Sequence, residues 1–84
     1  RIPEVPPELR RQLVEFIHEL RTLDLKKQPA ISETIDWART LVLLHAEALD
    51  PKLVTDTLNV ILKFQEDIEN VTTEVNSITA RITK

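Results

Sequence analysis

This 84-residue chain has no cysteine, no glycine and no methionine. Without cysteine, the chain can form no disulfide, no thiolate metal site and no cysteine nucleophile. Without glycine, it cannot build a phosphate-cradling loop of the G-x-G-x-x-G or G-x-x-x-x-G-K-[ST] kind, because these loops need backbone angles that glycine adopts freely. Since the chain also begins at Arg1, we expect it to be a piece of a longer protein.

Long apolar runs are missing as well. The longest, residues 41–44, is far shorter than the ~20 residues that span a bilayer. No charged segment followed by an apolar stretch and a cleavage site marks the chain for secretion, so we expect a cytoplasmic protein with no membrane contact. Its net charge of −3, with acids and bases interspersed, is unlike that of nucleic-acid binders, which gather Lys and Arg on one face.

What is present fits one small domain, 42% hydrophobic and 30% charged. A domain of this size buries only about 60% of the surface that its unfolded chain exposes, which leaves little room for a deep active site. Apolar residues recur every three or four positions, and the alternating patterns of strands are missing. The sequence therefore predicts an all-α fold, a small bundle of three to four helices.

The first predicted helix follows a proline-rich lead-in. We interpret residues 1–7 as a linker from a missing upstream domain, because three prolines disfavour regular structure there. Pro7 itself suits a first helical turn, and apolar residues then recur up to about Leu23. Pro29 pushes the residue before it away from helical angles, so we expect a loop over residues 24–30.

Two further helices are predicted from their first residues. Ser32 is a good N-cap for a helix over residues 33–47, which we expect to be the central and most buried helix because its second half is nearly all apolar. Asp50 followed by Pro51 is typical of an N-cap and a first helical position, and predicts a third helix. Its expected inner stripe consists of Leu53, Val54, Leu58, Ile61, Leu62 and Phe64.

The C-terminal part carries a heptad pattern, with apolar residues separated by alternating threes and fours. These residues are Ile61, Phe64, Ile68, Val71, Val75, Ile78 and Ile82. They predict that the last helix is long or broken, and we separate a helical domain of residues 8–69 from a heptad-patterned tail of residues 70–84. The seam either packs back on its own domain or forms a coiled contact with another chain.

Residues of catalytic or metal-binding type do not form a recognised constellation. His18 and His45 lie on different predicted helices and lack the H-E-x-x-H spacing that places two imidazoles on one face for zinc. The acidic pairs of residues 15 and 19 and of residues 66 and 67 are expected on solvated faces, since acid–base catalysis needs carboxylates around a concave site. We expect no catalytic residue and no metal site in this chain.

Trp37 and Arg39 are the most individual residues of the predicted second helix. They lie about 200° apart on a helix of ~3.6 residues per turn. If Trp37 packs inward, Arg39 points towards solvent or a partner. An ion pair with a neighbouring acid is the structural alternative for this arginine.

Four segments together resemble the C-terminal lid of MoxR-type AAA+ ATPases. They are residues 23–29 (LDLKKQP), 32–39 (SETIDWAR), 49–51 (LDP) and 63–68 (KFQEDI). The resemblance covers about residues 8–69, and its most specific part is the E-T-x-D-W-A-R block. It implies a helical lid over a P-loop core that lies outside this chain, with ATP and Mg²⁺ held through that core.

The resemblance further implies a ring homo-oligomer, commonly a hexamer, that acts as a chaperone-like remodeller, with a von Willebrand factor A-domain protein as a further partner. Such lids carry a "sensor 2" arginine that reaches the nucleotide phosphates, a role suited to a planar cation that stays charged. In the common pattern the register of that arginine falls on Thr34, and Arg39 lies five residues further on. Both positions are therefore candidates for contact with the nucleotide.

Two functions follow from the sequence. The first is a lid that covers the nucleotide site of an ATPase core and couples ATP binding and hydrolysis to remodelling; the parent would be the enzyme, because this chain has no catalytic machinery of its own. The alternative is an autonomous helical module that binds a partner through the C-terminal heptad seam.

Overall fold

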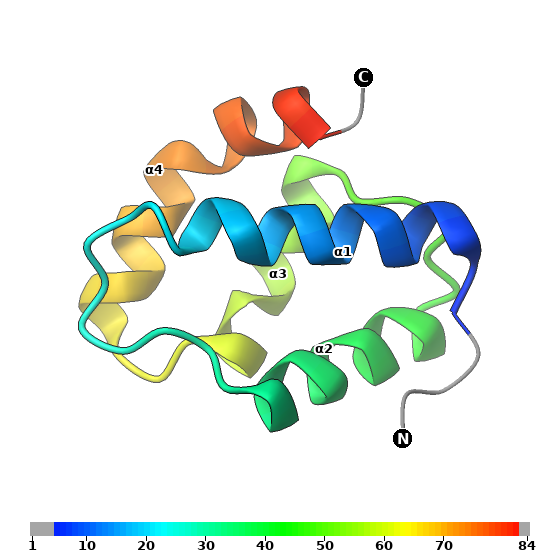
Figure 1. The fold of residues 1–84 in the computed structure, drawn as a ribbon, viewed down its shortest axis with the longest axis horizontal. Coiled ribbons are helices and arrows are strands. Elements are labelled where there is room, and N and C mark those ends of the chain that lie inside the picture. Colours follow the sequence, from blue (N-terminus) through cyan, green and yellow to red (C-terminus); the bar gives the residue numbers. More distant parts are fainter. Residues whose placement is uncertain (1–4, 83–84) are drawn as a thin grey trace.

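The computed structural model describes residues 5–82 and contains four helices, α1 (Pro7–Leu20), α2 (Ile31–Leu43), α3 (Pro51–Ile61) and α4 (Gln65–Ile82). No strand occurs in this part of the chain, and the predicted all-α bundle is confirmed. Each helix packs against two others, in the closed order α1, α2, α3, α4 and back to α1. In Figure 1, α2 runs antiparallel to α1 and below it, α3 crosses behind, and α4 rises to cover the remaining side.

A single apolar core lies between the four helices. The largest side chains buried in it are Trp37 and Phe16, whose ring centroids are 5.2 Å apart with the ring planes tilted by 51°. Such tilted aromatic pairs stabilise a core somewhat beyond the area they bury. The other fully buried large residues come from all four helices: Leu9, Leu20, Leu41, Leu58, Ile61, Ile78, Val54, Val71, Val75 and Asp67.

The predicted starts of α1 and α3 are confirmed. Pro7 is the first residue of α1, and Asp50 caps α3 by accepting a hydrogen bond from the backbone N–H of Leu53 at 2.8 Å. α1 ends at Leu20 rather than near Leu23, because residues 21–23 form turns in place of a further helical turn. Of the proposed linker, residues 1–4 lie outside the described part of the chain, as do residues 83–84 of the tail.

Ser32 is not the N-cap of α2, contrary to the sequence prediction. The helix begins at Ile31, and its N-cap is Ala30. The carboxylate of Glu33 accepts a hydrogen bond from the Ala30 backbone N–H at 2.8 Å, and the Ala30 carbonyl accepts one from the Thr34 N–H at 3.0 Å. Glu33 therefore supplies the acidic half of a capping box, which needs no hydroxyl at the cap itself.

The predicted length and burial of the second helix are also wrong. α2 ends at Leu43, four residues before Glu47, and it buries only Trp37, Ala38 and Leu41, half as many residues as α1 or α4. Leu43 is 78% exposed and Leu44 is 55% exposed. The apolar second half of α2 thus forms part of the surface.

α2 ends in a Schellman motif built around His45. The N–H of His45 donates to the carbonyl of Val42, and the N–H of Ala46 donates to that of Leu41, both at 3.0 Å. This arrangement requires a left-handed residue after the cap, and His45 has φ of +60°. Continuation of the helix past Leu44 is therefore blocked.

The heptad seam packs inside the domain. α4 is continuous across residues 69 and 70, and its buried side chains include Val71, Val75, Ile78 and Ile82, which contact α1 and α3. Phe64, expected in this stripe, is 44% exposed because the chain leaves helical geometry between α3 and α4. None of the four helices combines the length and the apolarity needed to cross a bilayer.

Candidate functional site

α2 carries both residues singled out by the sequence, and Trp37 fixes its orientation. The indole ring is fully buried, and its Nε1–H donates a hydrogen bond of 2.7 Å to the hydroxyl of Thr57 on α3. The Thr57 hydroxyl donates in turn to the backbone carbonyl of Leu53 at 2.9 Å. Because a buried indole N–H that lost its partner would be costly, this chain of hydrogen bonds specifies how α2 is rotated against α3.

Arg39 lies on the exposed side of α2, as expected from its angle to the buried Trp37. Leu43, one turn further along, lies on the same i, i+4 ridge and is largely exposed. Arg39 therefore extends from the exposed side of a helix whose rotation is set by a buried tryptophan.

Thr34 occupies a different part of the surface. Its hydroxyl donates to the Ala30 carbonyl at 3.1 Å, and its side chain lines a groove between α1 and α2. Five residues separate it from Arg39, which places the two side chains about 140° apart around the helix. The structure does not bring the two candidates together, so a ligand that meets one helix face contacts one of them.

A charged pair ties the start of α2 to the segment between α3 and α4. Lys63 Nζ lies 2.8 Å from the Glu33 carboxylate, which also accepts the hydrogen bond from the Ala30 amide. The backbone hydrogen bond and then the Lys63 ammonium lower the pKa of Glu33, and the same carboxylate raises the pKa of Lys63. Glu33 is thus occupied in holding α2 in place.

Two of the four segments that carried the family resemblance meet in space at the loop between α1 and α2. Asp67, in the first turn of α4, is 1% exposed, and its two carboxylate oxygens accept hydrogen bonds from the backbone N–H groups of Lys26 at 2.9 Å and Lys27 at 3.2 Å. Residues 23–29 and 63–68 are therefore linked through a buried carboxylate. Sequence reasoning had assigned Asp67 to a solvated face, which is wrong.

Further contacts hold the same loop. The Gln28 side-chain amide donates to the carbonyls of Leu20 at 3.0 Å and Leu23 at 3.2 Å, which also accept backbone hydrogen bonds from Leu23 and Leu25 respectively. The Lys26 ammonium lies 3.1 Å from the Glu66 carboxylate and 5.9 Å from the centre of the Phe64 ring. The loop is consequently fixed by its backbone and its side chains, although it has no regular secondary structure.

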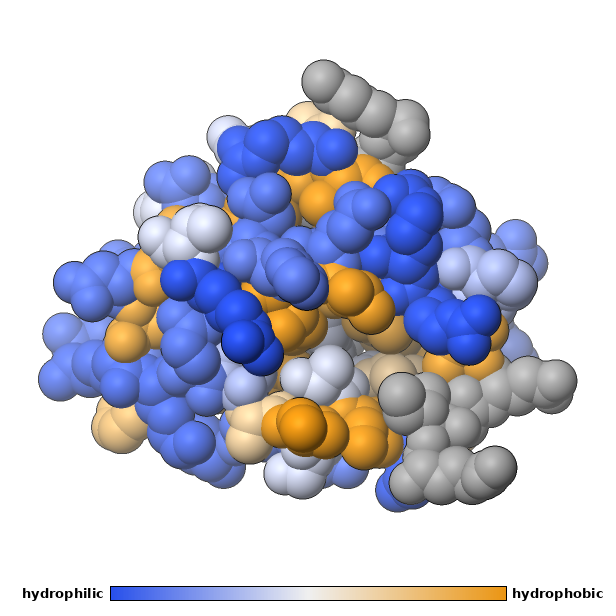
Figure 2. Space-filling view, viewed as in Figure 1, coloured by the Kyte–Doolittle hydropathy of each residue, from blue (hydrophilic) through white to orange (hydrophobic). Residues whose placement is uncertain are grey.

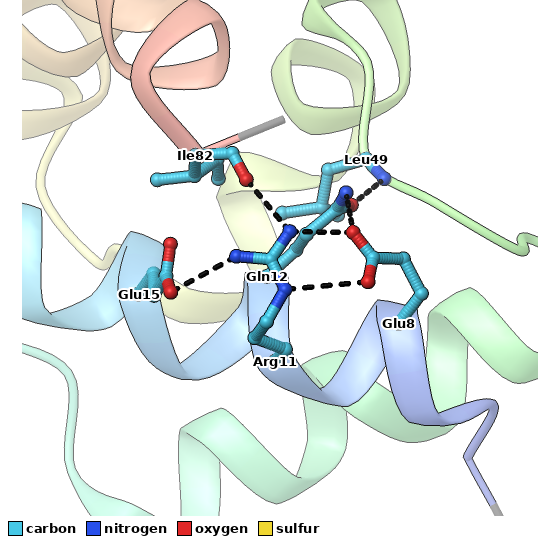
Figure 3. A network of polar contacts seen from close by, with 6 residues as sticks. All are labelled: Glu8, Arg11, Gln12, Glu15, Leu49 and Ile82. Carbon is cyan, nitrogen blue, oxygen red and sulfur yellow. Dashed lines mark hydrogen bonds and ion pairs between the residues drawn. The ribbon is translucent and has the colours of Figure 1, made fainter. Parts of the chain in front are cut away.

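A polar network joins α1 to the end of α4 and to the segment before α3 (Figure 3). Arg11 donates to the carboxylates of Glu8 and Glu15 and, at 3.1 Å, to the backbone carbonyl of Ile82 at the end of α4. The hydrogen bond from Arg11 lowers the pKa of Glu8, and these carboxylates raise the pKa of Arg11. This network anchors the last turn of α4, which is the part of the chain that we had expected to form a tail.

Gln12 attaches α1 to a second segment, at Leu49, and the sequence analysis did not identify this role. Its side chain is 3% exposed, accepts a hydrogen bond from the Leu49 backbone N–H at 2.7 Å and donates one to Glu8 at 2.9 Å (Figure 3). The available signal was its position: Gln12 lies on the buried side of α1, next to Leu13. A polar residue on the apolar side of a helix indicates a hydrogen bond to buried backbone.

The remaining residues of catalytic type are dispersed. His18 and His45 are both exposed, and within residues 5–82 no three His, Cys, Asp or Glu side chains are close enough to share a metal ion. The carboxylates of Glu15, Glu19 and Glu66 each form an ion pair, with Arg11, Arg81 and Lys26 respectively.

Comparisons with known proteins add no relative, since no family model, curated protein or solved structure matches the chain.

Proposed function

We propose that this chain is the C-terminal helical lid of a MoxR-type AAA+ ATPase, which covers the nucleotide site of a P-loop core encoded upstream. ATP and Mg²⁺ would be held by that core. Arg39 would approach the phosphates from the lid, because the planar fork of a guanidinium can bridge two oxygens. The ring assembly, the remodelling activity and a von Willebrand factor A-domain partner belong to the same proposal.

The observation that carries this proposal is the position of Arg39 relative to the start of α1. α1 begins at the end of the molecule where α2 finishes (Figure 1). A hollow there is lined by Pro6 together with Val42, His45, Ala46 and Glu47. A core joined through the residues before Pro6 would lie next to the last turn of α2, which is about one helical turn from Arg39.

The internal contacts also support a lid, which must move as a unit to couple nucleotide state to motion. A lid transmits force only if its helices keep their relative positions when its contacts with the core change. Asp67 fixes the loop between α1 and α2, and Arg11 fixes the last turn of α4 to α1. These two attachments favour a rigid body over a flexible cap.

The first test is the sequence encoded upstream of Arg1. The proposal requires a P-loop lysine motif there, and its absence from the full gene product would overturn the lid assignment. If the upstream sequence contains that motif, ATP binding and turnover are measured on the full-length protein and on its Arg39→Ala, Arg39→Lys and Lys52→Ala variants.

Loss of a charge-assisted hydrogen bond to phosphate costs about 1.5–3 kcal/mol, so Arg39→Ala should weaken ATP binding or turnover by about 10- to 150-fold. Arg39→Lys should recover part of this loss. Lys52→Ala, which removes an exposed cation on α3, should have no effect. If Arg39→Ala and Lys52→Ala behave alike, Arg39 is not a nucleotide contact; Thr34→Ala then tests the other position.

A further inference from the structure

A groove of about 260 Å³ lies between the second half of α1 and the first half of α2. Val14 and Ile17 from α1 and Ile31 and Ile35 from α2 supply its apolar lining, with His18 and Arg21 beside them. Val14 is 53% exposed and Ile31 is 79% exposed. The groove thus presents aliphatic side chains to solvent, and Figure 2 shows apolar groups emerging between the hydrophilic side chains of this face.

A stripe of α1 that is exposed except at Ile17, which is 8% exposed, extends this groove into an elongated track. Residues 10, 14, 17 and 21 follow the i, i+4, i+7, i+11 spacing and therefore lie in one stripe along the helix. At 1.5 Å per residue, Arg10 and Arg21 are about 16 Å apart along the axis. The stripe has an arginine at each end and apolar side chains between them, and it is as long as about three turns of a helix laid against it.

The two arginines at the ends of this stripe carry unneutralised charge. Within residues 5–82, neither Arg10 nor Arg21 forms an ion pair with an acidic side chain. The glutamates of α1 are engaged elsewhere, by Arg11 and Arg81. A chain with net charge −3 therefore keeps two cations at the ends of a stripe whose exposed apolar side chain is Val14.

We propose that this track, defined as Arg10, Val14, Ile17 and Arg21 on α1 with Ile31 and Ile35 on α2, binds an acidic amphipathic helix of a partner protein. The partner would place an apolar stripe of i, i+3, i+7 spacing into the groove and Asp or Glu side chains opposite Arg10 and Arg21. A helix in a groove buries apolar area, and the charge pairs determine which helix binds and in which position along the track. This inference goes beyond the lid assignment and is independent of it.

The test uses the 84-residue chain, labelled with ¹⁵N, and two synthetic peptides of about 14 residues, the length of a helix of nearly four turns. Both peptides carry leucine at i, i+3, i+7 and i+10; one has glutamate and the other has lysine at the flanking positions. The acidic peptide should cause saturable chemical-shift changes at Val14, Ile31 and Ile35. The basic peptide should bind about 5- to 10-fold more weakly or not at all, as expected for two exposed charge pairs.

Charge reversal tests directly whether the two arginines determine which peptide binds. The double variant Arg10→Glu/Arg21→Glu should prefer the basic peptide, because the signs at both ends of the track are exchanged. Lys52→Glu, whose side chain is 86% exposed on α3, changes the net charge in the same direction and should keep the preference for the acidic peptide. Val14→Ser should weaken binding without lowering the thermal midpoint, since this side chain is already half exposed.

Three results would overturn the proposal: equal binding of both peptides, shift changes that avoid the track, or an unchanged preference in the double variant. Sedimentation of the free chain as a dimer that Val14→Ser dissociates would also overturn it, because a second copy would then be the occupant. None of these results bears on ATP turnover, so failure here leaves the lid proposal to its own test.

Discussion

Asp67 Oδ1 lies 2.9 Å from the backbone nitrogen of Lys26, across 41 positions of the sequence. The carboxylate is almost fully buried, and its second oxygen accepts from the N–H of Lys27. Its position in the first turn of α4 also places the negative charge near the positive end of that helix dipole. One side chain therefore connects the first interhelical loop to the start of the last helix.

Replacement of Asp67 should loosen this connection and destabilise the fold. Asp67→Ala leaves two backbone donors unsatisfied, and we expect a loss of about 2–4 kcal/mol in the free energy of unfolding, measured by urea denaturation. Hydrogen exchange at the amides of Lys26 and Lys27 should accelerate. Glu66→Ala is the matched control, because it removes the adjacent carboxylate and its exposed ion pair with Lys26, which should cost less than about 1 kcal/mol. Equal losses in the two variants would contradict this account.

The burial of the α4 seam gives a second prediction. Ile78 is 1% exposed, so Ile78→Ala should lower the free energy of unfolding by about 2–5 kcal/mol. Phe64→Ala removes a larger side chain from a half-exposed position and should cost at most about 1 kcal/mol. The unfolding midpoint of the native chain should not depend on protein concentration. A midpoint that rises with concentration would indicate that the seam binds a second chain.

Much of the bundle could be predicted from local sequence signals. Pro7 and Asp50 marked helix starts through chemistry that acts within one turn, and the three-and-four spacing of the α4 seam identified most of its buried face. Phe64 was wrongly assigned to the buried stripe, because the apolar pattern continues through residues 62–64 although the backbone is not helical there. A periodic pattern reports which residues could share a face, and it does not report where the helix is interrupted.

The errors at α2 and at Asp67 have a different origin. Ser32 satisfied the usual preference for an N-cap, yet the side chain of Glu33 already pairs with the Ala30 amide, and this shifts the start of the helix by two residues. Asp67 belongs to the buried stripe through its i+4 spacing to Val71, but its partners are backbone amides of a distant loop. Such partners have no signature of their own in a single sequence.

The charged pair at the start of α2 predicts a loss of stability at acid pH. Folding lowers the pKa of Glu33 below its ordinary value of 4.5, because the ionised form is bonded to the Ala30 amide and to Lys63. The resulting stabilisation is complete above that ordinary value and is lost as the pH falls through the lower, folded-state value. The difference in unfolding free energy between the native chain and Glu33→Gln should therefore be larger at pH 7 than at pH 3, as measured by urea denaturation. For Glu74→Gln, at an exposed position of α4, the difference in unfolding free energy from the native chain should be the same at pH 7 and pH 3.

The last prediction concerns His45, the left-handed residue that ends α2, which occupies a position where many helices have glycine. His45 has φ of +60°, which costs a residue with a Cβ about 1–2 kcal/mol and costs glycine almost nothing. His45→Gly should therefore raise the free energy of unfolding by about 0.5–1 kcal/mol, part of the gain being offset by the greater entropy of the unfolded chain. For a domain of this size, that corresponds to a rise of about 2–8 °C in the thermal midpoint. His45→Val should lower the midpoint, since a β-branched side chain tolerates this region least. If both variants instead melt below the native chain, the imidazole itself stabilises the end of α2, and the helix is not ended by backbone conformation alone.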